Sequence, residues 1–355
     1  MLEKIKKLIK YFIYSGTWAP QPRSLILEIA SDCNLNCTMC FAREEEKKGG
    51  INRLSINQFK YILNELPELK EIMILGRGES FINPDIYKML EIGKEKSIKF
   101  SIITNGVLLT EENIKKIPDN VWQIIVSIDC PIADKYEKIR GGELNVVIEN
   151  IKKLKKVKKD IYVLINVVVM EDGIEDLPKF ADFAKDIGAN GINLLHLIAY
   201  NETLDKKHGD NFKNLKQKID ELKASAKEKN IEIIGRPLLQ KTTPCVAPWL
   251  TPKIFLNGDC YPCCTMGIIA PIRKEYYQGV AIDAPQYQYK MGNIFNDDFK
   301  KIWNGKDYRL LRGVIGKSRN SALLSPEEFN RKRLKTDLKK KFSYCEICSL
   351  RQNHF

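Results

Sequence analysis

Three of the ten cysteines in this chain of 355 residues lie close together near its beginning. Cys33, Cys37 and Cys40 have the spacing C-x3-C-x2-C and directly follow an apolar segment at 24–30. Three thiolates on one short loop can each bind a different iron of a cubane cluster, whereas a fourth would close the cluster. With only three thiolates, one iron stays open to an exogenous ligand. Zinc is the rival metal, but it prefers four ligands, and this loop adds only Asp32 and no histidine.

Further polar and glycine residues follow later apolar segments of the chain. Gly76-Arg77-Gly78-Glu79 follows the segment 71–75, and Thr104-Asn105-Gly106 follows 98–103. Ser127 and Asp129 end the segment at 122–128, and Cys130 comes next. Asn166 lies inside the apolar run 161–169, where a polar side chain needs a hydrogen-bond partner. These residues are candidates for a shared site.

Short β-branched segments alternate with helical patterns over the first two thirds of the chain. The strands are predicted at 24–30, 71–75, 98–103, 122–128, 161–169 and 191–197, with helices at 55–66, 85–96, 142–158 and 177–187 among those between them. Nearly continuous apolar strands are typical of a parallel sheet that is buried on both faces. Six such units predict an α/β fold, a partial (β/α)6 TIM-like barrel. In such barrels the chemistry lies at the carboxyl ends of the strands, where the candidate residues fall.

The pattern changes near residues 235–237, after a long charged helix predicted at 211–229. We expect three parts: an amphipathic helix and linker at 1–23, the barrel at 24–235, and a small α+β domain at 236–355. In the last part, Cys245 and Cys263 flank an Asn257-Gly258 pair, a strong signal for a hairpin turn. Cys345-x2-Cys348 follows much later.

The cysteine loop and the motifs after it resemble the radical SAM superfamily, in which C-x3-C-x2-C follows the first strand of a β/α domain. The resemblance implies that Cys33, Cys37 and Cys40 hold a [4Fe–4S] cluster whose open iron chelates S-adenosylmethionine (SAM). Reductive cleavage of SAM would then give a 5′-deoxyadenosyl radical that takes a hydrogen atom from the substrate.

The same resemblance implies roles for the other motifs. Gly76, Gly78 and Glu79 stand where the family usually has Gly-Gly-Glu-Pro, and would receive the SAM amino group; Arg77 and Ser80 depart from that pattern. Thr104 and Asn105 resemble a turn near the cofactor. Ser127 and Asp129 would bind the ribose hydroxyls of SAM or the substrate, and Asn166 the ribose or the carboxylate.

The C-terminal cysteines resemble the SPASM and twitch domains of many radical SAM enzymes, with Gly292-Asn293-Ile294 and Ile302-Trp303 between them. The resemblance implies an auxiliary [4Fe–4S] cluster on Cys245, Cys263, Cys345 and Cys348. The absence of cysteines beyond Cys348 favours the shorter twitch form. Either Cys260 or Cys264 could replace Cys263, and structural zinc on the same four residues is the rival assignment.

The resemblance leaves the reaction open. We expect an oxidoreductase that dehydrogenates a small hydroxyl-bearing carbohydrate or cyclitol, because a fully ligated auxiliary cluster suits electron transfer. A rival reaction is epimerisation, in which Cys130 returns a hydrogen atom, although Cys130 also fits a buried apolar role. A peptide-modifying enzyme is a further alternative. A non-enzymatic iron–sulfur electron carrier is the last, although the open iron and the motifs at the strand ends argue against it.

The formal net charge of +13 favours a solvated lysine-rich surface or an acidic redox partner. We expect an electron donor such as ferredoxin or flavodoxin. Nucleic acid is disfavoured, because no basic stripe interleaved with aromatic residues is present. No apolar run approaches the roughly 20 residues of a membrane span, and the chain start lacks a signal-peptide pattern, so we expect a cytoplasmic protein. The residues at 2–14 predict an amphipathic helix.

Overall fold

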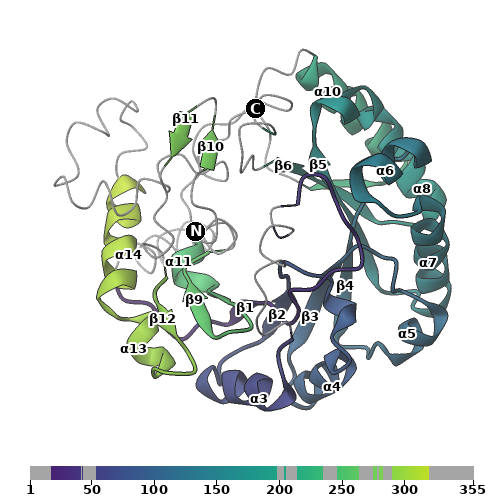
Figure 1. The fold of residues 1–355 in the computed structure, drawn as a ribbon. Coiled ribbons are helices and arrows are strands. Elements are labelled where there is room, and N and C mark those ends of the chain that lie inside the picture. Colours follow the sequence, from purple (N-terminus) through teal and green to yellow (C-terminus); the bar gives the residue numbers. More distant parts are fainter. Residues whose placement is uncertain are drawn as a thin grey trace, which may run out of the picture.

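The protein is built around one ten-stranded sheet, as the computed structural model shows (Figure 1). The structure describes residues 17–40, 42, 53–197, 204, 214–234, 246–263, 275–277, 280–282 and 290–319. Strands β1 to β7 lie in chain order and are parallel. They are β1 (Ser24–Leu27), β2 (Glu71–Ile74), β3 (Lys99–Thr104), β4 (Val121–Ser127), β5 (Tyr162–Val169), β6 (Gly191–His196) and β7 (Glu232–Ile234).

Helices connect these strands and cover the outer face of the curved sheet (Figure 1). They are α3 (Ile56–Glu65), the short η1 (Ser80–Ile82), α4 (Ile86–Glu95), α5 (Glu111–Lys116), α6 (Ala133–Arg140), α7 (Leu144–Val157), η2 (Glu171–Lys179), α8 (Phe180–Ile187) and α10 (Leu215–Glu228). The predicted partial barrel of six β/α units is thereby confirmed. The structure adds β7, whose apolar pattern is too short to stand out in the sequence.

Alternation along the strands separates an outer core from an inner face. In β4 the side chains of Ile124 and Val126 join the large hydrophobic cluster that includes residues of the surrounding helices. Their neighbours Gln123 and Ser127 point to the other side of the strand, because successive strand residues face opposite ways. The inner face is therefore the one on which polar residues accumulate.

The C-terminal elements extend the same sheet beyond β1. Strand β8 (Lys253–Ile254) pairs in parallel with β1, and β9 (Asp259–Tyr261) pairs antiparallel with β8. Gly258 in the turn has a φ of +87°, which glycine adopts without strain, so the predicted Asn257-Gly258 hairpin is confirmed. The remaining elements are α11 (Ala247–Leu250), β12 (Gly292–Asn293), α13 (Phe299–Trp303), α14 (Lys306–Arg319) and a separate pair, β10 (Glu275–Tyr277) and β11 (Val280–Ile282).

Some predicted features lie outside the described residues. They are the helix at 2–14, the first part of the helix at 211–229, and Cys245, Cys264, Cys345 and Cys348. Among the helices that the structure describes, none combines the length and apolar character that crossing a membrane requires.

Candidate functional site

The three clustered cysteines lie on the loop that follows β1, and this loop is anchored on the end of α6. The backbone N–H of Thr38 donates to Ile139 O over 2.8 Å, and the N–H of Cys40 donates to Cys37 O over 3.1 Å. Cys33 and Cys40 are partly exposed, whereas Cys37 is buried. The loop thus presents its thiols in a tight turn at the carboxyl end of the first strand, as the sequence predicts.

Burial disfavours the thiolate form of two of these cysteines, and two nearby hydrogen-bond donors favour it. Burial raises the pKa of Cys33 to about 11 and also raises the pKa of Cys37, although Arg140 opposes the shift at Cys37. Asn105 Nδ2 donates to Cys33 Sγ over 3.8 Å, and Arg140 Nη1 donates to Cys37 Sγ over 3.8 Å. Such donors stabilise negative sulfur, and bound iron would replace the thiol protons.

The donor set fits an iron–sulfur cluster. Within the described ranges, no three Cys, His, Asp or Glu side chains form a group suited to a single metal ion. A cubane needs no such convergence, because each thiolate binds a different iron. Cys33, Cys37 and Cys40 are therefore the residues that would hold the cluster.

Arg140 joins the cysteine loop to the ends of β4 and β5. Its Nε donates to Asp129 Oδ2 over 2.6 Å, and Asp129 Oδ1 accepts from the N–H of Val168 over 2.8 Å. Burial alone would lower the pKa of Arg140, but Asp129 and Cys37 raise it above its usual value. The Asp129 side chain is fully buried. The ribose contact expected of Asp129 stays a prediction, and the geometry shows a carboxylate that positions Arg140.

The loop at 76–79 lies against the residues that precede Cys33. The N–H of Glu79 donates to Asp32 O over 2.9 Å. A Cβ on Gly78 would lie 2.2 Å from that same oxygen, and a Cβ on Gly76 would lie 2.6 Å from Glu28 Cγ. Both positions therefore require glycine, and the close packing brings the loop to the cysteine turn.

The Glu79 carboxylate is buried and ties the ends of β2 and β3 together. It accepts from the N–H of Asn105 over 2.7 Å, from Thr104 Oγ1 over 2.8 Å and from the N–H of Phe81 over 3.1 Å. Burial raises its pKa, and these donors oppose the shift. Glu79, Thr104 and Asn105 thus form one hydrogen-bonded unit. The sequence predicted that these residues lie near one another, but it did not reveal their contacts.

We expect Glu79→Gln to weaken SAM binding by about 1.5–3 kcal/mol while both clusters stay intact, because a charge-assisted bond is lost. The amide NH2 of glutamine cannot accept a hydrogen bond, so one of the buried donors to Glu79 also loses its acceptor and the 76–79 loop is perturbed. Calorimetric titration of SAM into the reconstituted protein measures the change, with iron content as the check. The matched control is Glu112→Gln on the exposed surface of α5. An unchanged SAM affinity would remove Glu79 from the site.

A row of neutral polar side chains crosses three strands of the inner face. Ser127 on β4, Asn166 on β5 and Asn193 on β6 are in register with one another. Asn193 Nδ2 donates to Asn166 Oδ1 over 2.8 Å, which supplies the partner that Asn166 requires. Sequence reasoning missed Asn193. Its signal is a second asparagine at the equivalent position of the next strand.

Cys130 lies on the other side of the sheet, within the hydrophobic cluster. It is fully buried, and its Sγ donates to Asp176 Oδ2 over 3.9 Å. Lys135 and Lys179 pair with the same carboxylate. Burial raises the pKa of the Cys130 thiol. This setting supports the buried apolar role of Cys130 and offers no support for a hydrogen-donor role.

Two hairpin cysteines, Cys260 and Cys263, have opposite settings. Cys260 on β9 is fully buried, its Sγ donates to Gly258 O, and burial raises its pKa to about 12. Cys263 is partly exposed just past the end of β9. Cys263 is thus the more accessible of the two thiols, and its role as an auxiliary ligand stays a prediction. The other proposed ligands lie outside the described residues.

Helix α14 donates hydrogen bonds to two chain segments, one next to Cys263 and one next to Cys245. Tyr308 Oη donates to Tyr261 O over 3.1 Å, two residues before Cys263. Arg312 Nε donates to Pro248 O over 2.8 Å, three residues after Cys245. Burial lowers the pKa of Arg312 to about 10. Neither residue was identified from the sequence, because isolated polar residues on a helix carry no local signal.

Comparison with known proteins identifies two families in the chain. Residues 27–184 match the radical SAM superfamily, and residues 245–349 match an iron–sulfur cluster-binding domain named SPASM. An AdoMet-dependent heme synthase of Methanosarcina barkeri is 29% identical, over 50% of this chain and 51% of its own length. The chain thus matches about half of that relative.

Two further relatives match more of the chain. A tungsten-containing aldehyde ferredoxin oxidoreductase cofactor-modifying protein of Pyrococcus furiosus is 27% identical over 82% of this chain and 83% of its own. The antilisterial bacteriocin subtilosin biosynthesis protein AlbA of Bacillus subtilis is 24% identical over 80% of this chain and 60% of its own.

Solved structures share the fold. Streptococcus suis SuiB bound to the precursor peptide SuiA superposes with a TM-score of 0.64 at 20% identity, over 87% of this chain and 70% of SuiB. SuiB bound to S-adenosylmethionine superposes with a TM-score of 0.61. The family brings a [4Fe–4S] cluster and SAM, and the second domain brings auxiliary iron–sulfur binding. This chain belongs to the radical SAM superfamily and carries a C-terminal SPASM-type iron–sulfur domain.

Proposed function

We propose that this radical SAM enzyme oxidises its substrate by two electrons and that the C-terminal domain serves as the electron acceptor. When bound, the first cluster and SAM supply a 5′-deoxyadenosyl radical, and the auxiliary cluster supplies an acceptor for one electron. One hydrogen atom would pass from the substrate to the deoxyadenosyl radical, and the substrate radical would then give one electron to the auxiliary cluster and one proton to a base. The product is therefore two hydrogen atoms lighter, and one SAM is consumed per turnover.

The continuous sheet is the observation that carries this proposal. Strand β8 pairs directly with β1, so the hairpin that leads to Cys263 is joined to the strand that leads to Cys33. Cys33 therefore follows one strand of this sheet, and Cys263, the one proposed auxiliary ligand among the described residues, follows another. Such a connection suits an electron acceptor that works in the same active site as the radical chemistry.

The chain's own residues would bind and orient the reactants. Glu79 and the backbone around it hold the loop at 76–79 against the cysteine turn. Arg140, fixed by Asp129, donates to Cys37 and places positive charge beside the thiolates. The neutral row of Ser127, Asn166 and Asn193 can donate hydrogen bonds to an uncharged polar substrate and accept them from it.

A peptide is the substrate class that we favour. The support is the relative AlbA, named for biosynthesis of a bacteriocin and similar over 80% of this chain. Neutral amide side chains on the inner face also suit the amide groups of a polypeptide. The second candidate is a hydroxyl-bearing carbohydrate or cyclitol, which the same row of hydroxyl and amide groups can bind. To distinguish a peptide from a polyol, a peptide library and a polyol panel are each incubated with the enzyme. The substrate class is the one that gives SAM turnover together with a mass change.

Cys130→Ala tests oxidation against epimerisation. We expect the variant to retain product formation, because the thiol is buried in the outer core and contacts Asp176. Mass spectrometry should give a product two hydrogens lighter than the substrate, with no solvent deuterium added in heavy water. Epimerisation would replace this account if wild-type product gains one deuterium at unchanged hydrogen count and the variant makes deoxyadenosine without product.

A further inference from the structure

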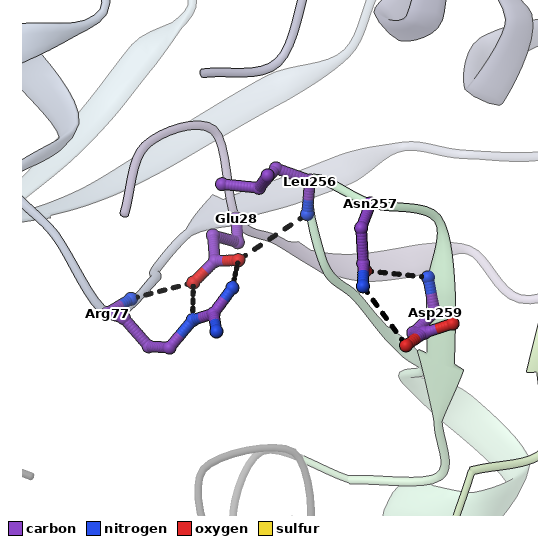
Figure 2. A network of polar contacts seen from close by, with 5 residues as sticks. All are labelled: Glu28, Arg77, Leu256, Asn257 and Asp259. Carbon is purple, nitrogen blue, oxygen red and sulfur yellow. Dashed lines mark hydrogen bonds and ion pairs between the residues drawn. The ribbon is translucent and has the colours of Figure 1, made fainter. Parts of the chain in front are cut away.

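The loop expected to bind SAM contains an arginine that is paired with a buried glutamate. Arg77 Nε donates to Glu28 Oε1 over 2.9 Å, and Arg77 Nη2 donates to Glu28 Oε2 over 2.8 Å (Figure 2). The backbone N–H of Arg77 donates to Glu28 Oε1 as well, over 2.9 Å. The Glu28 side chain is fully buried just after β1. A bidentate pair of this kind is strong and fixes orientation.

The same pair also contacts the C-terminal hairpin. The N–H of Leu256 donates to Glu28 Oε2 over 3.4 Å, and Figure 2 shows the hairpin strand passing beside the carboxylate. The Arg77 guanidinium lies 5.0 Å from the centroid of the Phe255 ring, and Lys253 Nζ lies 4.7 Å from it. Each Glu28 oxygen therefore accepts two hydrogen bonds: three of the four come from Arg77 in the loop, and the fourth, at Oε2, comes from Leu256 in the hairpin.

The backbone around the pair leaves the loop little freedom. The N–H of Glu28 donates to Ile254 O over 3.0 Å, which fixes Glu28 to β8. Gly76 packs so closely on Glu28 that a Cβ would lie 2.6 Å from Glu28 Cγ. A displacement of the hairpin would move Glu28, and a displacement of Glu28 would move the loop that leads to Glu79.

We propose that Glu28 and Arg77 are positioning residues that couple the seating of the C-terminal hairpin to the SAM affinity of the 76–79 loop. The coupling is reciprocal by thermodynamic necessity: a seated hairpin raises SAM affinity, and bound SAM stabilises the hairpin. This coupling rests on the proposed SAM site, and it makes SAM binding there depend on the C-terminal domain. Typical couplings change affinity by about 5- to 150-fold.

The first test uses the full chain with both clusters reconstituted and SAM as the probe. Hydrogen exchange at 253–261 should slow when SAM is added to the wild type. Arg77→Met should abolish this protection and weaken SAM binding about 10-fold at unchanged iron content. Arg309→Met, the same substitution at an exposed position of α14, should leave both properties unchanged.

A second variant approaches the coupling from the other domain. Phe255→Leu touches none of the loop hydrogen bonds, yet it should also weaken SAM binding, and its effect should be less than additive with that of Arg77→Met. Additive effects, or a hairpin that exchanges at the same rate with and without bound SAM, would overturn the coupling while leaving the SAM site standing. A wild type that fails to bind SAM would overturn the proposed function as well.

Discussion

The triple variant Cys33→Ala, Cys37→Ala, Cys40→Ala should hold about four iron and four sulfide per chain, against about eight of each in the wild type. The cysteine turn loses all three of its thiolates, so no ligand set for the first cluster remains. The C-terminal cysteines are untouched and should keep the auxiliary cluster. Iron and sulfide analysis after anaerobic reconstitution measures the difference.

Cys130→Ala is the matched control for this experiment, because it removes a thiol that is buried in the outer core. It should keep the full load of about eight iron. A triple variant that also keeps the wild-type load would show that Cys33, Cys37 and Cys40 bind no cluster, and the two-cluster assignment would be wrong.

Cys263→Ala and Cys260→Ala should differ sharply although the two cysteines stand three residues apart. Cys263 is partly exposed just past the end of β9, so its removal should cost the auxiliary cluster, about four iron. Such a variant should still form deoxyadenosine but make no oxidised product. Loss of iron from Cys260→Ala with retention in Cys263→Ala would reverse the assignment.

Cys260→Ala serves as the control, with an expected cost that appears in folding rather than in iron content. The thiol is fully buried and donates to Gly258 O. Its removal should destabilise the fold by about 1 kcal/mol through lost packing. Denaturant unfolding of the iron-free forms measures this change separately from cluster binding.

Local patterns were enough to predict the strands and the cysteine turn. Apolar runs at 122–128 and 161–169 became β4 and β5 within one residue at each end, because a strand buried on both faces must be continuously apolar. The helix predicted at 55–66 formed as α3, and the structure adds that Ser55 caps it together with Gln58. The turn at Asn257-Gly258 formed as expected, since glycine accepts the positive φ. These features depend on neighbours in the chain.

Contacts between distant residues could not be predicted from local patterns. Glu28 is a charged residue within the apolar segment predicted at 24–30, just after β1, and its partner Arg77 stands 49 positions later. Ser80, where the family usually has proline, donates its hydroxyl to Ile103 O over 3.1 Å. Arg77 and Ser80, the two departures from the family pattern, therefore both have hydrogen-bond partners on neighbouring parts of the sheet. Side-chain pairing of this kind depends on which strands become neighbours, and periodicity alone does not specify it.

The two carboxylates at the site show the same limit. Glu79 was expected from the resemblance to contact SAM, and Asp129 to contact SAM or the substrate; both are buried with hydrogen-bond partners in the protein. Their type and place were foreseeable, because functional residues of such barrels lie at the carboxyl ends of the strands. Their partners, the N–H groups of Asn105 and Val168, become visible only when adjacent strands are seen in register.

Every proposal above depends on reductive cleavage of SAM at the cluster of Cys33, Cys37 and Cys40. The most direct measurement is chromatographic quantification of 5′-deoxyadenosine after reduced, reconstituted protein is incubated with SAM under anaerobic conditions. We expect deoxyadenosine and methionine in equal amounts from the wild type and none from the triple alanine variant. Intact SAM with the wild type, or equal cleavage by the triple variant, would contradict this expectation.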